Sequence, residues 1–206
     1  TMAAIGAEER RAERDAVLKL LGVAKPAKVA IVVEPQLPSE MRTNSARAQA
    51  WLSQIVSEKH AKNGSLGDGK QSISIPITRS PANRARYNQF TRRIHANRSS
   101  QPSAIVHEFG HAIEEYGEAH ELCKGFLYSR VQNEPTKNLA ALFPAHGYDP
   151  WESGREDKFA KAYNGRLSDD SKADRRTSAF YAGKQYTGFT EVLSMGAEQL
   201  YNDPVG

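Results

Sequence analysis

The sequence has a single cysteine and no long apolar run, and each absence excludes a class of protein. Because Cys123 is alone among 206 residues, no disulfide can form within the chain, so the fold depends on its core and any bound metal. No stretch approaches the roughly 20 apolar residues that span a bilayer, so we expect no membrane span. The first apolar run, 16–23, contains Lys19 and follows charged residues, which predicts a soluble chain without a signal peptide.

The chain also lacks a strong charge of one sign. Its net charge is only +4, although five arginines gather in one short stretch: Arg84, Arg86, Arg92, Arg93 and Arg98. No nucleic-acid motif and no interleaved aromatic pattern accompany them, so we expect a solvated basic face and no nucleic-acid partner. The pair at 92 and 93 indicates acidic positions in a substrate.

The clearest motif in the chain is His-Glu-x-x-His at 107–111. Side chains four residues apart lie on one face of a helix, so His107 and His111 can reach one metal ion. Glu108, beside the first histidine, can reach a metal-bound water without binding the metal itself. The residues around the motif are apolar, which favours a buried site. Because this pattern is typical of zinc-binding helices in metallopeptidases, we predict a Zn2+ ion bound by the two histidines.

The periodicity of apolar residues predicts an α+β fold, mainly helical, with a small mixed sheet next to the motif helix. Helices are expected over 3–22, about 45–62, 103–117 and 190–201, and strands over 29–33, 72–77 and 90–96. Pro76 indicates that its strand lies at an edge of the sheet or ends early. The strand over 90–96 is expected to offer its edge to a substrate backbone. Residues 125–174 read as an irregular surround of the active site.

A catalytic zinc needs a third protein ligand and one open position. Glu191 is preferred because it begins an otherwise apolar helix, and a buried carboxylate is costly unless it is paired or binds a metal. Its alternative role is a glutamate that the helix dipole favours in a first turn. Glu198 is next, either as a ligand or as the residue that holds a ligand imidazole by its other nitrogen. Further candidates are Asp149, His120, Glu134, Glu152 and Glu156.

Two stretches carry a resemblance to a known group of enzymes. The motif helix, with Tyr116 after it, resembles the zinc helix of the anthrax lethal factor catalytic domain and its relatives. The stretch 181–196 resembles the downstream ligand helix of bacterial and phage-associated proteins of the same zincin group. Across about 84–203 the resemblance implies a zincin-like, gluzincin-type domain with Glu191 as the third zinc ligand. It also implies an oxyanion-stabilising tyrosine shortly before that ligand, with Tyr186 preferred over Tyr181.

These observations predict a zinc metallopeptidase that acts on a protein or peptide substrate, with Glu108 as general base. We expect one catalytic domain over 1–206, made of an N-terminal portion, 1–80, and a metal-site portion, 84–203. The resemblance implies secretion or delivery as an effector or toxin, while the residues themselves leave compartment and oligomeric state open. Two alternatives remain at this point: a zinc hydrolase of another kind, and a catalytically weak zincin-like structural or interaction domain of a phage-like or secretion-system protein.

Overall fold

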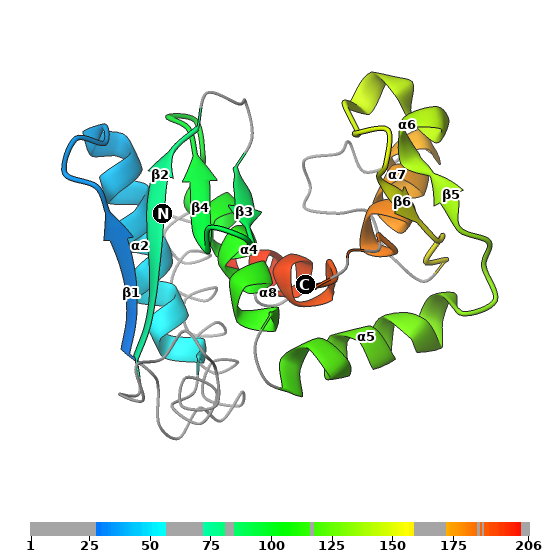
Figure 1. Ribbon diagram of the computed structural model, residues 1–206, viewed down its shortest axis with the longest axis horizontal. Helices are drawn as coiled ribbons and strands as arrows, with labels where there is room; N and C mark the ends of the chain where they lie inside the picture. Colours follow the sequence, from blue (N-terminus) through cyan, green and yellow to red (C-terminus); the bar gives the residue numbers. More distant parts are fainter. Residues whose placement is uncertain are drawn as a thin grey trace, which may run out of the picture.

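The computed structural model describes residues 28–56, 72–80, 85–115, 118–158, 172–184, 186 and 188–202. Within them a four-stranded sheet packs against long helices, and a second group of short helices and strands lies beyond these (Figure 1). The expected combination of helices with a small mixed sheet is confirmed. The helix predicted over 3–22 lies outside the described residues. Among the described residues, no helix is both long and apolar enough to cross a membrane.

The sheet has the strand order β1-β2-β4-β3. β1 (Lys28–Val33), β2 (Ser72–Arg79) and β4 (Arg93–Ala96) run parallel, and β3 (Arg86–Asn88) is antiparallel to β4. The sheet therefore combines β1 and β2, from the expected N-terminal portion 1–80, with β4 and β3, from the expected metal-site portion 84–203.

The expectation that Pro76 marks an edge strand or an early strand end is wrong. β2 runs on to Arg79 and lies between β1 and β4. However, β4 pairs only with residues 77–79 of β2, so no strand lies opposite Pro76 on that side. A proline lacks the amide hydrogen of a ladder bond, and this local gap is the kind of position where it is tolerated.

The strand predicted over 90–96 is shorter than expected and lies inside the sheet, so its edge is not available to a substrate. The chain turns back between Asn88 and Arg93, where the Asn88 side chain accepts hydrogen bonds from the amides of Phe90 and Thr91. Arg92 takes a positive φ of 53° in this turn. The tight turn brings β3 to the outside of β4, so β3 is the edge strand on this side of the sheet.

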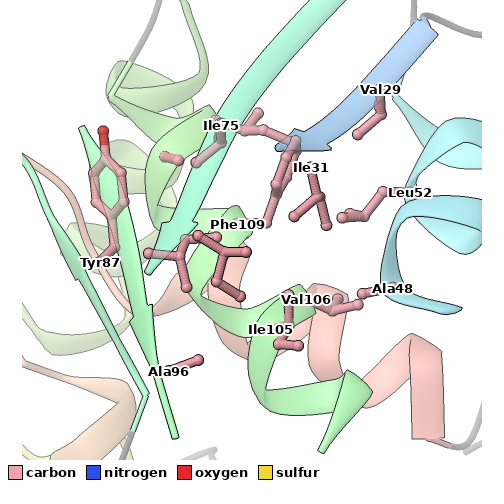
Figure 2. Packing of buried hydrophobic residues seen from close by; sticks show 14 of the residues in the cluster. Val29, Ile31, Ala48, Leu52, Ile75, Tyr87, Ala96, Ile105, Val106 and Phe109 are labelled. Atoms are coloured by element: carbon pink, nitrogen blue, oxygen red, sulfur yellow. The ribbon is translucent and has the colours of Figure 1, made fainter. Parts of the chain in front are cut away.

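Three helices form the main core together with the sheet. These are α2 (Ser39–Ile55), α4 (Pro102–Glu114) and α8 (Val192–Asn202). Figure 2 shows apolar side chains of β1, α2 and α4 gathered beneath the strands, among them Ile31, Leu52, Val106 and Phe109. α4 is buried along its whole length, and α8 packs most extensively against it. The motif helix is thus the central element of this core.

The expectation of an irregular region over 125–174 is wrong for much of its described part. α5 (Glu118–Val131) extends into it, followed by β5 (Lys137–Asn138), α6 (Leu139–Leu142), a 3-10 turn (Pro144–His146) and β6 (Ser153–Gly154). α7 (Lys172–Ala182), which the sequence did not predict, completes this part. Leu139, Phe143 and Phe180 form a second, smaller core there. α4 and α8 lie between this group and the sheet (Figure 1).

Candidate metal centre

The polar residues of the motif on α4 are buried. His107 and His111 are each 5% exposed and Glu108 is 9% exposed. Glu191 lies immediately before α8 and is completely buried. A histidine or carboxylate at such depth needs a partner, because an unpaired polar or charged group in the interior is costly.

The two histidines and Glu191 converge on one point. The Nε2 atom of His107 lies 3.2 Å from Oε2 of Glu191, and the Nε2 atom of His111 lies 3.4 Å from the same oxygen. One ligand atom from each residue lies within 4.8 Å of the others. His107, His111 and Glu191, the metal-ligating group, could therefore hold a metal ion. Glu191, the candidate preferred as third ligand, contacts both histidines.

Two further contacts fix this group. Nδ1 of His107 lies 2.9 Å from Oε2 of Glu198, so Glu198 contacts the far side of the imidazole, the second of the two roles considered for it. The Ser194 hydroxyl lies 3.0 Å from Oε2 of Glu191. Among the described residues, Nδ1 of His111 has no hydrogen-bond partner.

The neighbouring carboxylates control the charge of the metal-free site. Burial alone would lower the pKa of His107, but the carboxylates of Glu191 and Glu198 outweigh it and raise the pKa to about 10. Burial would likewise raise the pKa of Glu191, yet the charges of His111 and His107 hold it well below its usual value. Without a metal, a proton on His107 therefore balances the Glu191 carboxylate.

Glu108 lies next to the metal-ligating group, and a hydrogen bond from β3 fixes its orientation. Its Oε2 atom accepts a hydrogen bond of 2.6 Å from the backbone amide of Tyr87. This contact ties the motif helix to the edge strand. Glu108 also lines a cavity of about 210 Å3, which His107, His111 and Glu191 line as well. The carboxylate is therefore held beside the metal-ligating group without belonging to it.

The two candidate tyrosines lie at different positions in the site. The Tyr186 hydroxyl donates a hydrogen bond of 2.8 Å to Oε1 of Glu191, and burial together with this carboxylate raises the pKa of Tyr186. The Tyr181 hydroxyl lies 3.4 Å from Nε2 of His107, on the metal-facing side of that ring. Tyr186 is therefore hydrogen-bonded to Glu191, whereas the Tyr181 hydroxyl lies beside the ring nitrogen of His107 that faces Glu191.

The position of Glu191 depends on a carboxylate that sequence reasoning missed. Glu114, at the end of α4, is completely buried, and its Oε1 atom accepts a 2.6 Å hydrogen bond from the amide of Thr190. The Thr190 hydroxyl in turn accepts a 3.1 Å bond from the amide of Val192 and caps α8. Glu114 thereby joins the end of the motif helix to the start of the ligand helix. The sequence feature that could have revealed Glu114 is its position as a charged residue in a helix that is otherwise largely apolar.

The other candidates for a third ligand lie outside the ligand group. Glu134 forms a 2.6 Å ion pair with Lys158, and His120 lies 3.6 Å from Glu114. Asp149 lines the cavity through the loop before β6. Among the described residues, the only group placed for metal binding is His107, His111 and Glu191, so Glu156 does not belong to it.

Cys123 and Arg93, two further residues considered for a functional role, do not belong to the metal-ligating group. Burial and the nearby Glu114 carboxylate raise the pKa of Cys123 to about 12, so its thiol stays protonated and is a poor nucleophile. The sequence led us to expect that Arg92 and Arg93 contact acidic positions of a substrate. In the structure Arg93 forms an ion pair with Glu34 at 3.4 Å.

The cavity at the metal-ligating group continues into a larger one. This second cavity has a volume of about 510 Å3 and lies along β3. Both cavities share lining residues: Arg86, Tyr87, Trp151, Tyr186 and Phe189. Phe90 and Trp151, which are 90% and 76% exposed, border the larger one. The buried group is thus connected to an open, partly aromatic cleft.

Comparisons with protein families, with curated proteins and with solved structures found no match for this chain.

Proposed function

We propose that this chain is a zincin-type zinc metallopeptidase. The observation that carries the proposal is the spacing of the donor atoms in the buried group. Zinc bonds of about 2.0–2.1 Å in a tetrahedron place neighbouring ligand atoms about 3.3–3.4 Å apart. The two imidazole nitrogens lie 3.2 and 3.4 Å from the Glu191 oxygen.

The type and number of the donors support a catalytic rather than a structural site. Two histidines and one glutamate are a common ligand set of zinc peptidases, whereas structural zinc sites usually have four protein ligands with cysteine among them. Only three ligands come together among the described residues, and a carboxylate that is not a ligand, Glu108, lies next to them. The cavity that these residues line would leave room for a water molecule as a fourth ligand.

The residues around the proposed ligands support amide hydrolysis as the reaction. A bound zinc ion supplies Lewis acidity, which lowers the pKa of water and polarises a carbonyl group. Glu108, held by the Tyr87 amide, takes the proton of the attacking water and then protonates the leaving amine. Tyr181, on the metal-facing side of His107, donates a hydrogen bond to the negative charge that develops on the carbonyl oxygen.

The cleft supports a polypeptide as the substrate. β3 is an edge strand beside the metal-ligating group, so an extended peptide can add to it through main-chain hydrogen bonds. The larger cavity beside β3 then receives substrate side chains, and Phe90 and Trp151 favour large apolar ones.

The test is a search for new peptide N-termini after incubation of a proteome extract with the zinc-loaded chain. Wild type is compared with Glu108→Gln, which loses the general base, and with Glu118→Gln, an exposed carboxylate on α5. We expect new N-termini with wild type and Glu118→Gln but not with Glu108→Gln, while all three bind zinc. Zinc binding without cleavage by wild type would contradict the peptidase proposal and favour the structural alternative.

A further inference from the structure

Lys184 is a buried cation that the hydrolysis described above does not use. It follows α7 and is only 2% exposed. Its backbone amide donates to the carbonyl of Tyr181, and the residue bridges to Gly154 of β6. At the preceding residue, Gly183, a Cβ atom would overlap the carbonyl of Arg155, so the backbone can follow this path only with glycine there. The position of Lys184 is therefore fixed by the fold.

The ammonium group lies between two carboxylates and three aromatic rings. Nζ is 2.6 Å from Oε1 of Glu152 and 3.6 Å from Oε1 of Glu191. The ring centres of Tyr181 and Tyr186 are each 4.8 Å from Nζ, and that of Tyr148 is 5.5 Å away. Cation–π contacts and a paired carboxylate offset the cost of burying the charge.

The two oxygens of Glu191 consequently have different surroundings. Oε2 lies between the two metal-facing imidazole nitrogens and near the Ser194 hydroxyl. Oε1 accepts the Tyr186 hydroxyl at 2.8 Å and lies nearest to the Lys184 ammonium. One oxygen thus points toward the metal position, and the other is held by a donor and a cation on the opposite side.

We propose that Lys184, itself held by Glu152, is a positioning residue that makes Glu191 bind the metal through Oε2 alone. This inference rests on the proposed function. A carboxylate that binds through both oxygens occupies an additional coordination position, and a catalytic zinc needs an open one for water and the substrate carbonyl. The ammonium and the Tyr186 hydroxyl attract Oε1 away from the metal and keep that position open.

The test replaces the ion pair as a unit, in the double variant Lys184→Met with Glu152→Gln, so that no buried charge is left unpaired. Cobalt serves as the probe because its visible absorption weakens as its coordination number rises. The matched control is Arg130→Met with Asp157→Asn, which removes another ion pair with a 2.6 Å contact, formed between α5 and the loop after β6. Thermal unfolding of each protein shows whether it folds.

We expect the double variant to bind about one cobalt ion per chain with weaker visible absorption than wild type. After zinc loading, its kcat falls about 10–100-fold with little change in KM, the range typical for lost partners of metal ligands. The control should match wild type in the cobalt spectrum and kcat. Tyr186→Phe, which removes only the other contact to Oε1, should weaken the absorption in the same direction and keeps the test valid if the double variant does not fold.

Two outcomes would overturn the inference, and they are distinguishable. If wild type binds metal and cleaves peptides but the folded double variant has an unchanged cobalt spectrum, Lys184 is only a structural residue. If the double variant does not fold, an unchanged cobalt spectrum of Tyr186→Phe overturns the inference instead. If wild type itself binds no metal, the proposed function fails, and the inference fails with it.

Discussion

At the scale of single residues, the surroundings of His107 determine how the site responds to pH. The carboxylates of Glu191 and Glu198 raise its pKa to about 10, whereas a metal binds only the neutral imidazole. Near neutral pH the metal-free site therefore holds a proton that zinc must displace. Because the folded pKa lies above the unfolded value of 6.5, this proton stabilises the metal-free fold fully below about pH 6.5, and the stabilisation is lost as pH rises through about 10.

Zinc binding at pH 7.5 should accordingly release about one proton from His107, and zinc affinity should rise with pH. Calorimetric titrations in buffers with different ionisation heats measure the proton count. Glu198→Gln is the matched comparison, because it removes one of the carboxylates that raise the pKa but no ligand. We expect fewer protons released by this variant. A binding heat that is independent of the buffer in wild type would contradict the assignment.

The two tyrosines provide a second prediction at this scale. Tyr181→Phe should lower kcat about 100-fold and leave zinc affinity unchanged, because its hydroxyl faces the reacting group. Tyr186→Phe should alter metal binding instead, because its hydroxyl holds Glu191. Steady-state kinetics and a competitive zinc titration separate the two effects, and the reverse assignment would show that Tyr186 is the oxyanion donor.

The residues of the motif could be predicted because their relation is local. His107 and His111 share a helix face by spacing alone, and Glu191 was found by asking why a carboxylate begins an apolar helix. The atoms that the hydroxyls of Tyr181 and Tyr186 contact were not accessible in this way. Tyr181 is 74 residues from His107, and which hydroxyl reaches which atom depends on how the end of α7 packs against α4.

At the scale of elements, the metal-ligating group depends on how closely α4 and α8 approach each other. Gly110, between the two motif histidines, makes this approach possible: a Cβ atom there would lie 2.6 Å from Cα of Ser194 and 3.0 Å from its nitrogen. Both are backbone atoms of α8, so they cannot give way without shifting the ligand helix.

Gly110→Ala should therefore lower the free energy of unfolding by about 1–3 kcal/mol and weaken zinc binding, because α8 must move away from the histidines. Gly196→Ala on α8 is the matched control, since nothing lies within 4 Å of the position that a Cβ atom would take there, and alanine should stabilise the helix by up to about 1 kcal/mol. Denaturant unfolding measures both. Equal stability of the two variants would rule out the close helix approach.

The edge strand gives a prediction about the substrate. Phe90 is 90% exposed and borders the larger cavity, so Phe90→Ala should leave stability unchanged but raise KM several-fold for peptides with a large apolar residue. Phe126→Ala, at an exposed position of α5 away from both cavities, is the control. Peptide kinetics with and without an apolar residue test this, and an equal effect of the two variants would exclude the cavity as a binding site.

The strands show where sequence patterns stop being informative. A continuous apolar run located β1 and alternation located most of β2, but position in the sheet depends on pairing between distant segments. Pro76 was assigned to an edge by its chemistry, whereas the short reach of β4 provides the gap it needs. Residues 90–96 were predicted to form one strand, but the turn at Arg92 delays the start of β4 to Arg93. The same turn places β3 at the edge of the sheet beside β4.

At the scale of the whole molecule, the candidate site is lined by residues from both parts of the fold, each of which has its own apolar core. α4 and the start of α8, elements of the main core, carry the two histidines and Glu191, whereas α7, which contributes Phe180 to the smaller core, carries Tyr181. Lys184 comes from the same second part. The sequence predicted an active-site surround over 125–174, but not α7 or the Lys184–Glu152 pair, because buried ion pairs between distant segments leave no local pattern.

A metal ion held by His107, His111 and Glu191 would join α4 to the start of α8. The three proposed ligands converge only after folding, so the proposal predicts that saturating zinc stabilises the fold, by about 4 kcal/mol at a free zinc concentration about 1,000 times the Kd. Thermal unfolding with and without zinc measures the gain, and an unchanged unfolding temperature would contradict a metal bound between the two helices.

The most direct test of the central claim is the zinc content of the purified, zinc-loaded and dialysed chain, measured by elemental mass spectrometry. We expect about one zinc ion per chain in wild type and in Glu108→Gln, and almost none in folded His111→Ala or Glu191→Ala. A wild-type chain without zinc, or full zinc retention in the folded Glu191→Ala variant, would contradict the assignment of His107, His111 and Glu191 as the ligands of a catalytic zinc.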